Sequence, residues 1–185
     1  HFEKDILLID KYEVIVRIWH YLQEASLHDI MSLPEPKLGE KINRDDFDCI
    51  EQAWLMGFLV QQGVSTPMLT VSPFAENNIK TQKKNIATQL YKIKHWKIKQ
   101  LDYLEIPNEE ATWFIDPPYF KGGYKYKHNT MDYSRLAEWC KEREGQVIVC
   151  ENDSASWLPF KQMVKTNGSV ATTNEVIWSN QPTVY

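Results

Sequence analysis

The sequence lacks several features that assign a protein to a class at first reading. Its 185 residues include only three cysteines, at positions 49, 140 and 150, which are far apart and form no CxxC pair. Neither a disulfide framework nor a zinc site is therefore indicated. No apolar run approaches the about 20 residues that cross a bilayer, and the first residues lack the basic start and apolar stretch of a signal peptide. We expect a protein of a reducing, cytoplasmic setting with no membrane partner.

Other absences concern ligands and chemistry. The histidines show no spacing typical of metal ligands, so no metal is expected. Neither G-x-S-x-G nor G-x-x-x-x-G-K occurs in the chain, which argues against a small-molecule enzyme built on a nucleophile elbow or a phosphate loop. The formal charge of -4 at pH 7 argues against a protein that coats nucleic acid without specificity.

Short apolar segments alternate with helical ones along the chain. Five segments predict strands: residues 5–10, 95–103, 111–115, 146–150 and 174–180. Four predict helices: residues 11–25, 44–63, 76–94 and 132–145. This alternation predicts an α/β fold with a mostly parallel sheet, closed by a last strand that pairs antiparallel near an edge. Residues 33–94 read as a mostly helical insertion, which leaves 1–32 and 95–185 as the core.

Two of the expected helices have recognisable ends. Acids at 45–48 are expected to begin one helix and Gly63 to end it. One face of that helix carries apolar side chains at helical spacing: Phe47, Ile50, Trp54 and Phe58. Asp132 is expected to cap the last helix and Gly145 to end it.

Polar residues follow four of the predicted strands. They are Asp10, Asp102, Asp116 and the pair Glu151 and Asn152. A single acid after a strand is commonplace, because Asp favours turns. In parallel α/β sheets, however, ligands bind outside the carboxyl ends of the strands. Four such ends at one edge therefore predict a binding site there.

The segment Ile115-Asp116-Pro117-Pro118-Tyr119 places an acid, two prolines and an aromatic ring behind an apolar strand. The plain alternative is a proline-rich turn that only ends the strand. The functional interpretation is a rigid catalytic loop, because proline fixes φ at about −65° and restricts the residue before it. Such a loop can hold the Asp116 carboxylate and the Pro117 carbonyl as two acceptors for a nucleobase amine, while Tyr119 stacks on the base.

Residues 115–120, IDPPYF, resemble the catalytic motif of S-adenosylmethionine-dependent N6-adenine DNA methyltransferases of phage or bacterial type. The resemblance implies a Rossmann-like methyltransferase sheet, mostly parallel with an antiparallel closing strand, plus a helical insertion that serves target recognition. It implies S-adenosylmethionine as cofactor and double-stranded DNA as partner, with the target adenine flipped out. It assigns catalysis to Asp116, Pro117, Pro118 and Tyr119. It assigns cofactor contacts to Asp116, to Asp10 at the ribose hydroxyls and to Asp102 at the adenine ring.

Two lysine-bearing segments are candidates for phosphate contacts. Residues 80–99 carry seven lysines and no acid, and form either a solvated face or a surface that grips DNA through Lys83, Lys84 and Lys94. Residues 120–128, FKGGYKYKH, are either an exposed hairpin or a loop that closes over the extruded base. In the second interpretation Lys121 and Lys125 contact phosphate.

The family's glycine-rich cofactor loop, Phe-x-Gly-x-Gly, has no counterpart in the sequence. Because the chain begins with His1 rather than Met, we expect that loop upstream of His1. The alternative function is a catalytically inactive nucleic-acid-binding subunit that kept the fold and lost the loop. Binding of S-adenosylmethionine to the complete gene product separates the two. RNA adenine and the N4 amine of cytosine are alternative substrates of the same chemistry.

Overall fold

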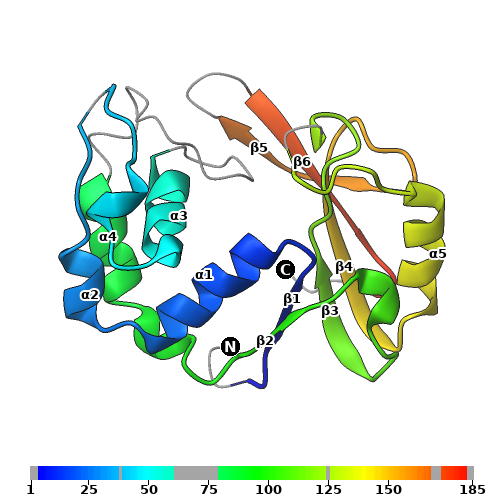
Figure 1. Ribbon diagram of the computed structural model, residues 1–185. Helices are drawn as coiled ribbons and strands as arrows, with labels where there is room; N and C mark the ends of the chain where they lie inside the picture. The colour runs from blue at the N-terminus through cyan, green and yellow to red at the C-terminus, as the bar shows by residue number, and fades with distance from the viewer. Residues whose placement is uncertain (1–3, 38, 61–78, 124–125, 168–171, 183–185) are drawn as a thin grey trace. The chain divides into compact units, whose positions relative to one another are not determined.

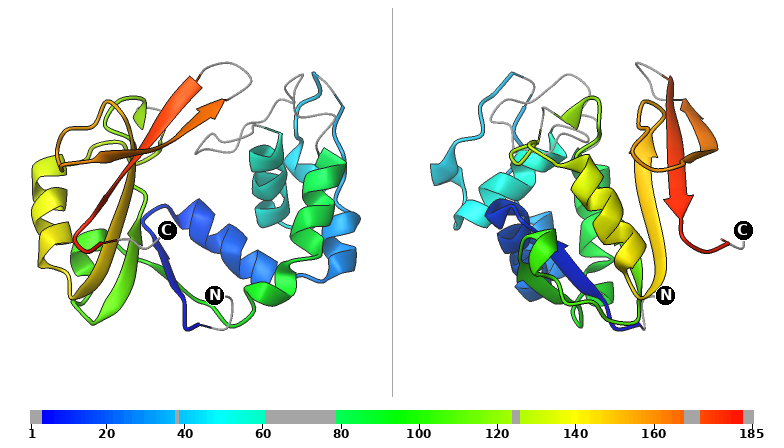
Figure 2. Two further views of the ribbon diagram at one scale, coloured as in Figure 1. Left: turned by 180° about the vertical axis from the view of Figure 1, so that it is seen from behind. Right: turned by 90° about the vertical axis from the view of Figure 1, so that its right-hand side faces the viewer.

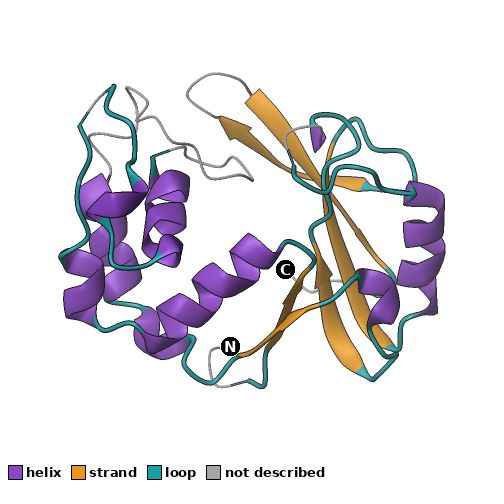
Figure 3. Ribbon diagram, in the orientation of Figure 1, coloured by secondary structure: helices purple, strands orange, loops and turns teal. Residues whose placement is uncertain are grey.

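The computed structural model of the chain describes residues 4–37, 39–60, 79–123, 126–167 and 172–182. The chain divides into two compact units, His1–Tyr103 and Leu104–Tyr185. The first unit is mostly helical and the second mostly strand (Figures 1 and 3). The predicted α/β class is confirmed. The division into a core and an insertion at 33–94 is not tested by these contacts and stays a prediction.

The sheet of the first unit is a parallel pair. β1 (Leu7–Asp10) lies beside β2 (Lys97–Gln100), with Leu7 opposite Lys97 and Asp10 opposite Gln100. Helix α1 (Glu13–Glu24) follows β1 and packs on both strands. Both strands were predicted, although each is shorter than the segment predicted for it. Because the two strands are parallel, their carboxyl ends lie at the same edge of the sheet. Asp10 and Asp102 are therefore found at that edge, as predicted.

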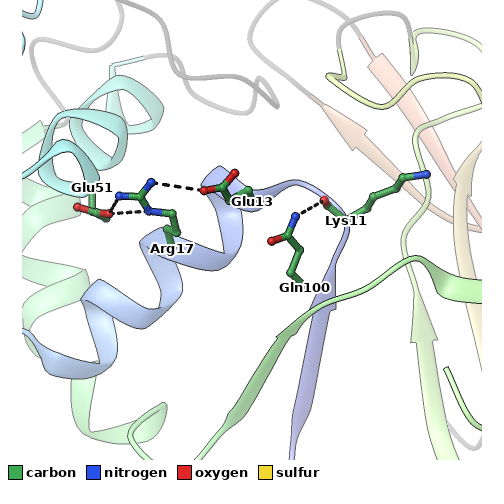
Figure 4. Close-up of polar contacts among 5 residues, drawn as sticks. All are labelled: Lys11, Glu13, Arg17, Glu51 and Gln100. Carbon is green, nitrogen blue, oxygen red and sulfur yellow. Dashed lines mark hydrogen bonds and ion pairs between the residues drawn. The ribbon is translucent and has the colours of Figure 1, made fainter. Parts of the chain in front are cut away.

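Arg17 joins helix α1 to helix α3 (Ile50–Leu59) at the rim of the helical core. Its Nε donates to Glu51 at 2.8 Å, its Nη2 also contacts Glu51, and its Nη1 pairs with Glu13 at 3.4 Å (Figure 4). The guanidinium carbon also lies 4.9 Å from the centre of the Trp54 ring. A planar guanidinium suits this combination, since it can pair with carboxylates in its plane while its face meets an aromatic ring.

The helical core lies between α1 and three further helices, α2 (Leu27–Met31), α3 and α4 (Ile79–Ala87). Its most deeply buried members come from three of these elements and from the end of α3: Ile30, Met56, Val60 and Ile79. α2 is short, and a reciprocal capping box between Ser26 and Asp29 satisfies its first backbone donors. Packing against a shared core, rather than propensity, stabilises a helix this short.

Helix α3 begins and faces differently from what the sequence predicts. It starts at Ile50, and the acids at 45–46 belong to a separate 3₁₀ turn, Arg44–Asp46. Phe47 precedes the helix, while Ile50, Trp54 and Phe58 are only partly buried. The fully buried side is Ala53, Met56 and Leu59 with their neighbours. The helix is apolar on nearly every side, so the spacing of its apolar residues could not identify the inner face. Gly63, the predicted end, lies outside the described residues.

Helix α4 is shorter than the helix predicted over 76–94. It ends at Ala87 and is followed by a 3₁₀ turn, Leu90–Lys92; residues 76–78 lie outside the described part of the chain. The side chains of Thr88 and Gln89 donate to the carbonyls of Lys84 and Asn85 at 2.9 and 3.0 Å. These contacts satisfy carbonyls that the end of a helix leaves without partners.

The sheet of the second unit has the strand order β3-β4-β6-β5. β3 (Ala111–Ile115) and β4 (Gly145–Asn152) are parallel, whereas β6 (Thr172–Ser179) runs antiparallel to β4 and to β5 (Lys161–Asn167); Figure 2 shows these strands from two further sides. The antiparallel closing strand near an edge is confirmed. Two points are corrected: β5 was not predicted, because its sequence is polar, and the sheet of the second unit is mixed rather than mostly parallel.

Helix α5 (Tyr133–Glu142) connects β3 to β4 and was predicted closely. The Asp132 side chain accepts from the backbone N–H of Arg135 at 3.0 Å, so the expected cap is confirmed. Its buried face carries Leu136 and Cys140 at a spacing of one turn. Gly145 does not end this helix but opens β4, where its φ of 88° requires glycine.

Gly145→Ala is expected to lower the free energy of unfolding of the second unit by about 3 kcal/mol. A Cβ at this position would lie 2.1 Å from the Ala111 carbonyl oxygen, and the backbone conformation itself disfavours a side chain. Gly122→Ala is the matched control, because Gly122 has a φ of 96° but no heavy atom within 4 Å of the place that a Cβ would take. It should cost about 1 kcal/mol. Urea denaturation followed by tryptophan fluorescence measures both, and equal losses would contradict the explanation.

Candidate active site at the strand ends of the second unit

Acidic residues from three strands meet at one edge of the second sheet. Ile115 pairs with Val149, so Asp116 follows β3 beside the last three residues of β4, of which Glu151 is the second. The antiparallel β6 brings Glu175 opposite Asn152. The predicted convergence of strand-end acids is therefore found within this unit for Asp116 and Glu151. Glu175 joins them through a pairing that the sequence did not reveal.

The backbone of the predicted motif is held by hydrogen bonds as well as by its prolines. Pro117 is buried, and the Pro118 carbonyl accepts from the Tyr133 hydroxyl at 2.6 Å. The Gly123 amide donates to the Tyr119 carbonyl at 3.0 Å and closes a turn behind the motif. The plain alternative, a turn that only ends the strand, does not require these contacts. The loop is fixed at several points between positions 117 and 123.

Asp116 is exposed, and its carboxylate lacks a hydrogen-bond donor among the described residues. The surrounding protein removes part of its hydration. This desolvation raises the pKa of Asp116, and the negative charge of Glu175 raises it further. A carboxylate that has lost part of its hydration, and whose oxygens accept no hydrogen bond from the described residues, is suited to accept hydrogen bonds from the N–H groups of a ligand.

The Tyr119 ring is oriented by its hydroxyl group. That hydroxyl donates to Oε2 of Glu175 at 3.0 Å. Desolvation, followed by the nearby charge of Asp116, raises the pKa of Tyr119, so the phenol stays protonated and remains a donor. The side chain thus adjoins the Asp116 carboxylate as a neutral, half-buried ring, which is the form that stacks on a base.

Aromatic rings support the loop. Phe120 packs edge-on against Tyr133, with ring centres 5.1 Å apart, and Tyr133 packs against Trp157 at 5.6 Å. Trp157 meets Phe160 at 5.1 Å. The sequence analysis placed Glu151 at the predicted binding edge without a specific role, and it did not identify Tyr133 or Glu175 as site residues. The positions of Tyr133 and Glu175 depend on tertiary packing.

The two other acids predicted to contact a cofactor, Asp10 and Asp102, lie in the first unit. Oδ1 of Asp10 accepts from the backbone N–H of Tyr12 at 2.7 Å, and Oδ2 of Asp102 pairs with Lys11 at 2.6 Å. Asp10 is the last residue of β1 and Asp102 follows β2, and the carboxyl ends of these strands are adjacent because the strands are parallel. Each unit therefore has its own pair of neighbouring strand ends that carry one acid each.

Lys83 does not fit its predicted contact with nucleic acid. Its side chain is only 1% exposed, and its ammonium donates to the Leu33 carbonyl at 2.7 Å and to Glu35 at 2.8 Å. Helical spacing placed it beside exposed lysines, but the packing of α4 on α2 turned it inward. This prediction is corrected: Lys83 serves the core of the first unit.

The other predicted lysines differ in their surroundings. Lys84 is exposed on α4, and the exposed Lys94 donates to the carbonyls of Gln23 and, at 3.0 Å, Ala25 at the end of α1. Lys121 is exposed beside the motif, while Lys125 lies outside the described residues. Lys84 and Lys121 thus have exposed side chains that can reach a phosphate without breaking a hydrogen bond or ion pair to any of the described residues.

Comparison with known proteins assigns no family, since no protein-family model and no curated protein matches the sequence. Among the described residues, no cluster of His, Cys, Asp or Glu side chains is arranged to hold a metal ion. Nor does the described part of the chain contain a helix of the length and apolarity that crossing a bilayer requires.

Lys83→Ala is expected to lower the free energy of unfolding of the first unit by about 3 kcal/mol, because it removes a buried cation from Glu35 and the Leu33 carbonyl. The neighbouring Lys84→Ala should change it by less than about 0.5 kcal/mol. Chemical denaturation measures both variants. In the DNA-binding interpretation of residues 80–99, Lys84→Ala should instead weaken binding to DNA of any sequence and flatten its salt dependence. A Lys83 variant of normal stability and reduced DNA affinity would contradict this assignment.

Asp116→Asn is expected to raise the melting temperature of the second unit by about 1–3 °C at pH 7. The raised pKa of Asp116 means that its charged form is disfavoured in the folded state, so the carboxylate costs stability at neutral pH. As the pH falls below the unfolded pKa, Asp116 is neutral in both states and the advantage should vanish. Thermal melts between pH 3 and pH 7 test this, and a gain independent of pH would contradict it.

Proposed function

We propose that this chain carries the catalytic machinery of an S-adenosylmethionine-dependent methyltransferase that acts on the N6 amine of adenine in DNA. The observation that carries the proposal is the Asp116 carboxylate, which has no hydrogen-bond donor among the described residues and stands directly before a proline-locked loop. The resemblance of residues 115–120 to the family's catalytic motif supplies the reaction. The antiparallel strand β6 agrees with the sheet that this family implies.

Asp116 and Pro117 supply two acceptors for the amine. The lone pair of an exocyclic amine is conjugated with the base, which makes the nitrogen a poor nucleophile. Two acceptors that receive its two N–H bonds draw it toward a tetrahedral shape. The Pro118 carbonyl already accepts from Tyr133, whereas the Pro117 carbonyl accepts no hydrogen bond from the described residues. The second acceptor is therefore assigned to Pro117.

Tyr119 provides the surface on which the extruded base rests. An aromatic ring that stacks on a base contributes about 1–3 kcal/mol. Its bond to Glu175 sets the direction of the ring before any base arrives, which lowers the entropy lost on capture. A base must leave the duplex to meet both Tyr119 and Asp116, so the substrate is a flipped adenine.

The acids of the first unit suit a nucleoside cofactor. Carboxylates such as those of Asp10 and Asp102 accept hydrogen bonds from ribose hydroxyls or from an adenine amine, and both stand at the carboxyl ends of parallel strands. When bound, S-adenosylmethionine supplies the electrophilic methyl group. Asp10 and Asp102 would bind and orient it. We place the target-recognition role in residues 33–94, and the protein in the cytoplasm.

The rival proposal is a nucleic-acid-binding subunit without catalysis, the alternative function that the sequence analysis leaves open. Methylation of RNA adenine or of cytosine N4 would use the same Asp116 and Tyr119 contacts. Equilibrium binding of S-adenosylmethionine to the full-length protein separates catalysis from the rival. Methyl incorporation into duplex DNA, into RNA, and into DNA whose only target base is cytosine distinguishes the three candidate substrates.

Asp116→Ala is expected to lower the turnover of DNA methylation by at least about 10³-fold while DNA affinity stays within about threefold. The reason is that Asp116 acts on the amine only after the base is extruded, so its contribution lies mainly in the transition state. Incorporation of labelled methyl groups measures turnover. Glu138→Ala, which removes an exposed carboxylate from α5, is the matched control and should change neither quantity.

Tyr119 variants test the stacking role separately. Tyr119→Ala should weaken capture of the flipped base, reported by a fluorescent adenine analogue at the target position, whereas Tyr119→Phe keeps the ring and should retain most activity. Near-normal turnover of Asp116→Ala, or equal damage from the two Tyr119 variants, would show that the assigned roles are wrong.

A further inference from the structure

Glu151 is a carboxylate buried at a position where stability alone favours an apolar side chain. It is 0% exposed and follows Val147 and Val149, also 0% exposed, on the same inner face of β4. No Lys or Arg of the described chain pairs with it. Burying an unpaired charge is costly, and a well-packed apolar residue is often the more stable choice. The position therefore calls for an explanation beyond core packing.

Three N–H groups hold this carboxylate, and one of them belongs to the motif loop. Oε1 accepts from the Phe120 backbone amide at 2.8 Å and from the Trp157 indole at 3.1 Å, while Oε2 accepts from the Asn152 amide at 3.0 Å. Charge-assisted bonds of this kind are stronger than neutral ones. Glu151 thus joins the end of β4 to the residue that directly follows Tyr119.

Two neighbouring contacts complete the attachment of the loop. The Asn152 side chain donates to the Lys121 carbonyl at 2.8 Å, and the Tyr133 hydroxyl donates to the Pro118 carbonyl at 2.6 Å. The peptide groups on both sides of Tyr119 are therefore fixed, one from α5 and one from β4. A loop held on both sides cannot shift its central side chain independently of the sheet.

We propose that Glu151 is a positioning residue, whose buried carboxylate fixes the loop through Phe120 and thereby places Asp116 and Tyr119 for the reaction. The effect on turnover rests on the proposed function, whereas the attachment of the loop does not. Glutamine cannot replace Glu151, because both carboxylate oxygens accept. In either orientation, the amide of Glu151→Gln turns an NH₂ group toward an N–H donor. A displacement of about 1 Å at a reacting group can cost about 10²-fold in rate.

Hydrogen exchange of the full-length protein tests the attachment without any need for activity. In the wild type, the Phe120 amide should be protected although it lies in no strand or helix. Glu151→Gln should lower its protection by about tenfold or more, while the Val147 and Val149 amides on β4 stay unchanged. Glu138→Gln, an exposed residue of α5, is the control and should leave all of them unchanged. Unaltered Phe120 protection, or a uniform loss across β4 and β6, would overturn the proposal.

Kinetics then test the consequence for the reaction. Glu151→Gln should lower kcat for DNA methylation by about 10²-fold and change KM for DNA by less than about threefold. A loss confined to KM, or an unchanged kcat with the Phe120 amide released, would overturn the positioning role. Glu151→Asp keeps the charge, but its side chain is one methylene too short to reach the Phe120 amide. It should therefore lower both the protection of the Phe120 amide and kcat. This variant replaces Glu151→Gln in both experiments if the Gln variant does not fold. If Asp116→Ala leaves methylation intact, the proposed function fails, yet the exchange result still decides whether Glu151 holds the loop.

Discussion

The parallel pairing of β3 with β4 is the constraint on which the candidate site depends. Because Ile115 lies opposite Val149, Asp116 leaves β3 beside the last three residues of β4, which include Glu151. A shift of one residue would turn Glu151 from the inner face to the outer face of the sheet. The close approach of Gly145 to Ala111 at the other end fixes this register. Loop geometry near Asp116 is therefore set partly by a glycine at the far end of the strands.

The site concentrates negative charge without a compensating cation among the described residues. The pKa values of Asp116 and Glu151 are both raised, chiefly by desolvation. For Glu151 the N–H donors offset part of that effect, whereas no described residue donates to Asp116. Such an arrangement lowers stability near neutral pH and favours a ligand that brings donors. This is the usual relation between a functional site and the stability of its fold.

The first unit shows how charge patterning along a helix can mislead. Lys80, Lys83 and Lys84 read as one basic stretch, yet the structure separates them into a buried core cation and exposed neighbours. Within the first unit, the ion pair of Lys83 with Glu35 connects α4 to the segment around Glu35. A lysine can be buried in this way because its alkyl chain is apolar and packs in the core, while its ammonium group donates hydrogen bonds to acceptors at the far end of the side chain.

The sequence alone was enough to predict most helices and strands, the N-cap at Asp132, and the loop at Asp116–Tyr119, because these follow from local spacing, caps and the stiffness of proline. It also placed acids at the ends of strands. The tertiary structure was needed to show which side of α3 is inner, since that helix is apolar nearly all round. Likewise, it alone revealed β5, the burial of Lys83, and the meeting of Tyr119 with Glu175, 56 residues away. Those outcomes depend on which distant segments pack together, and no local pattern encodes a partner that lies far along the chain.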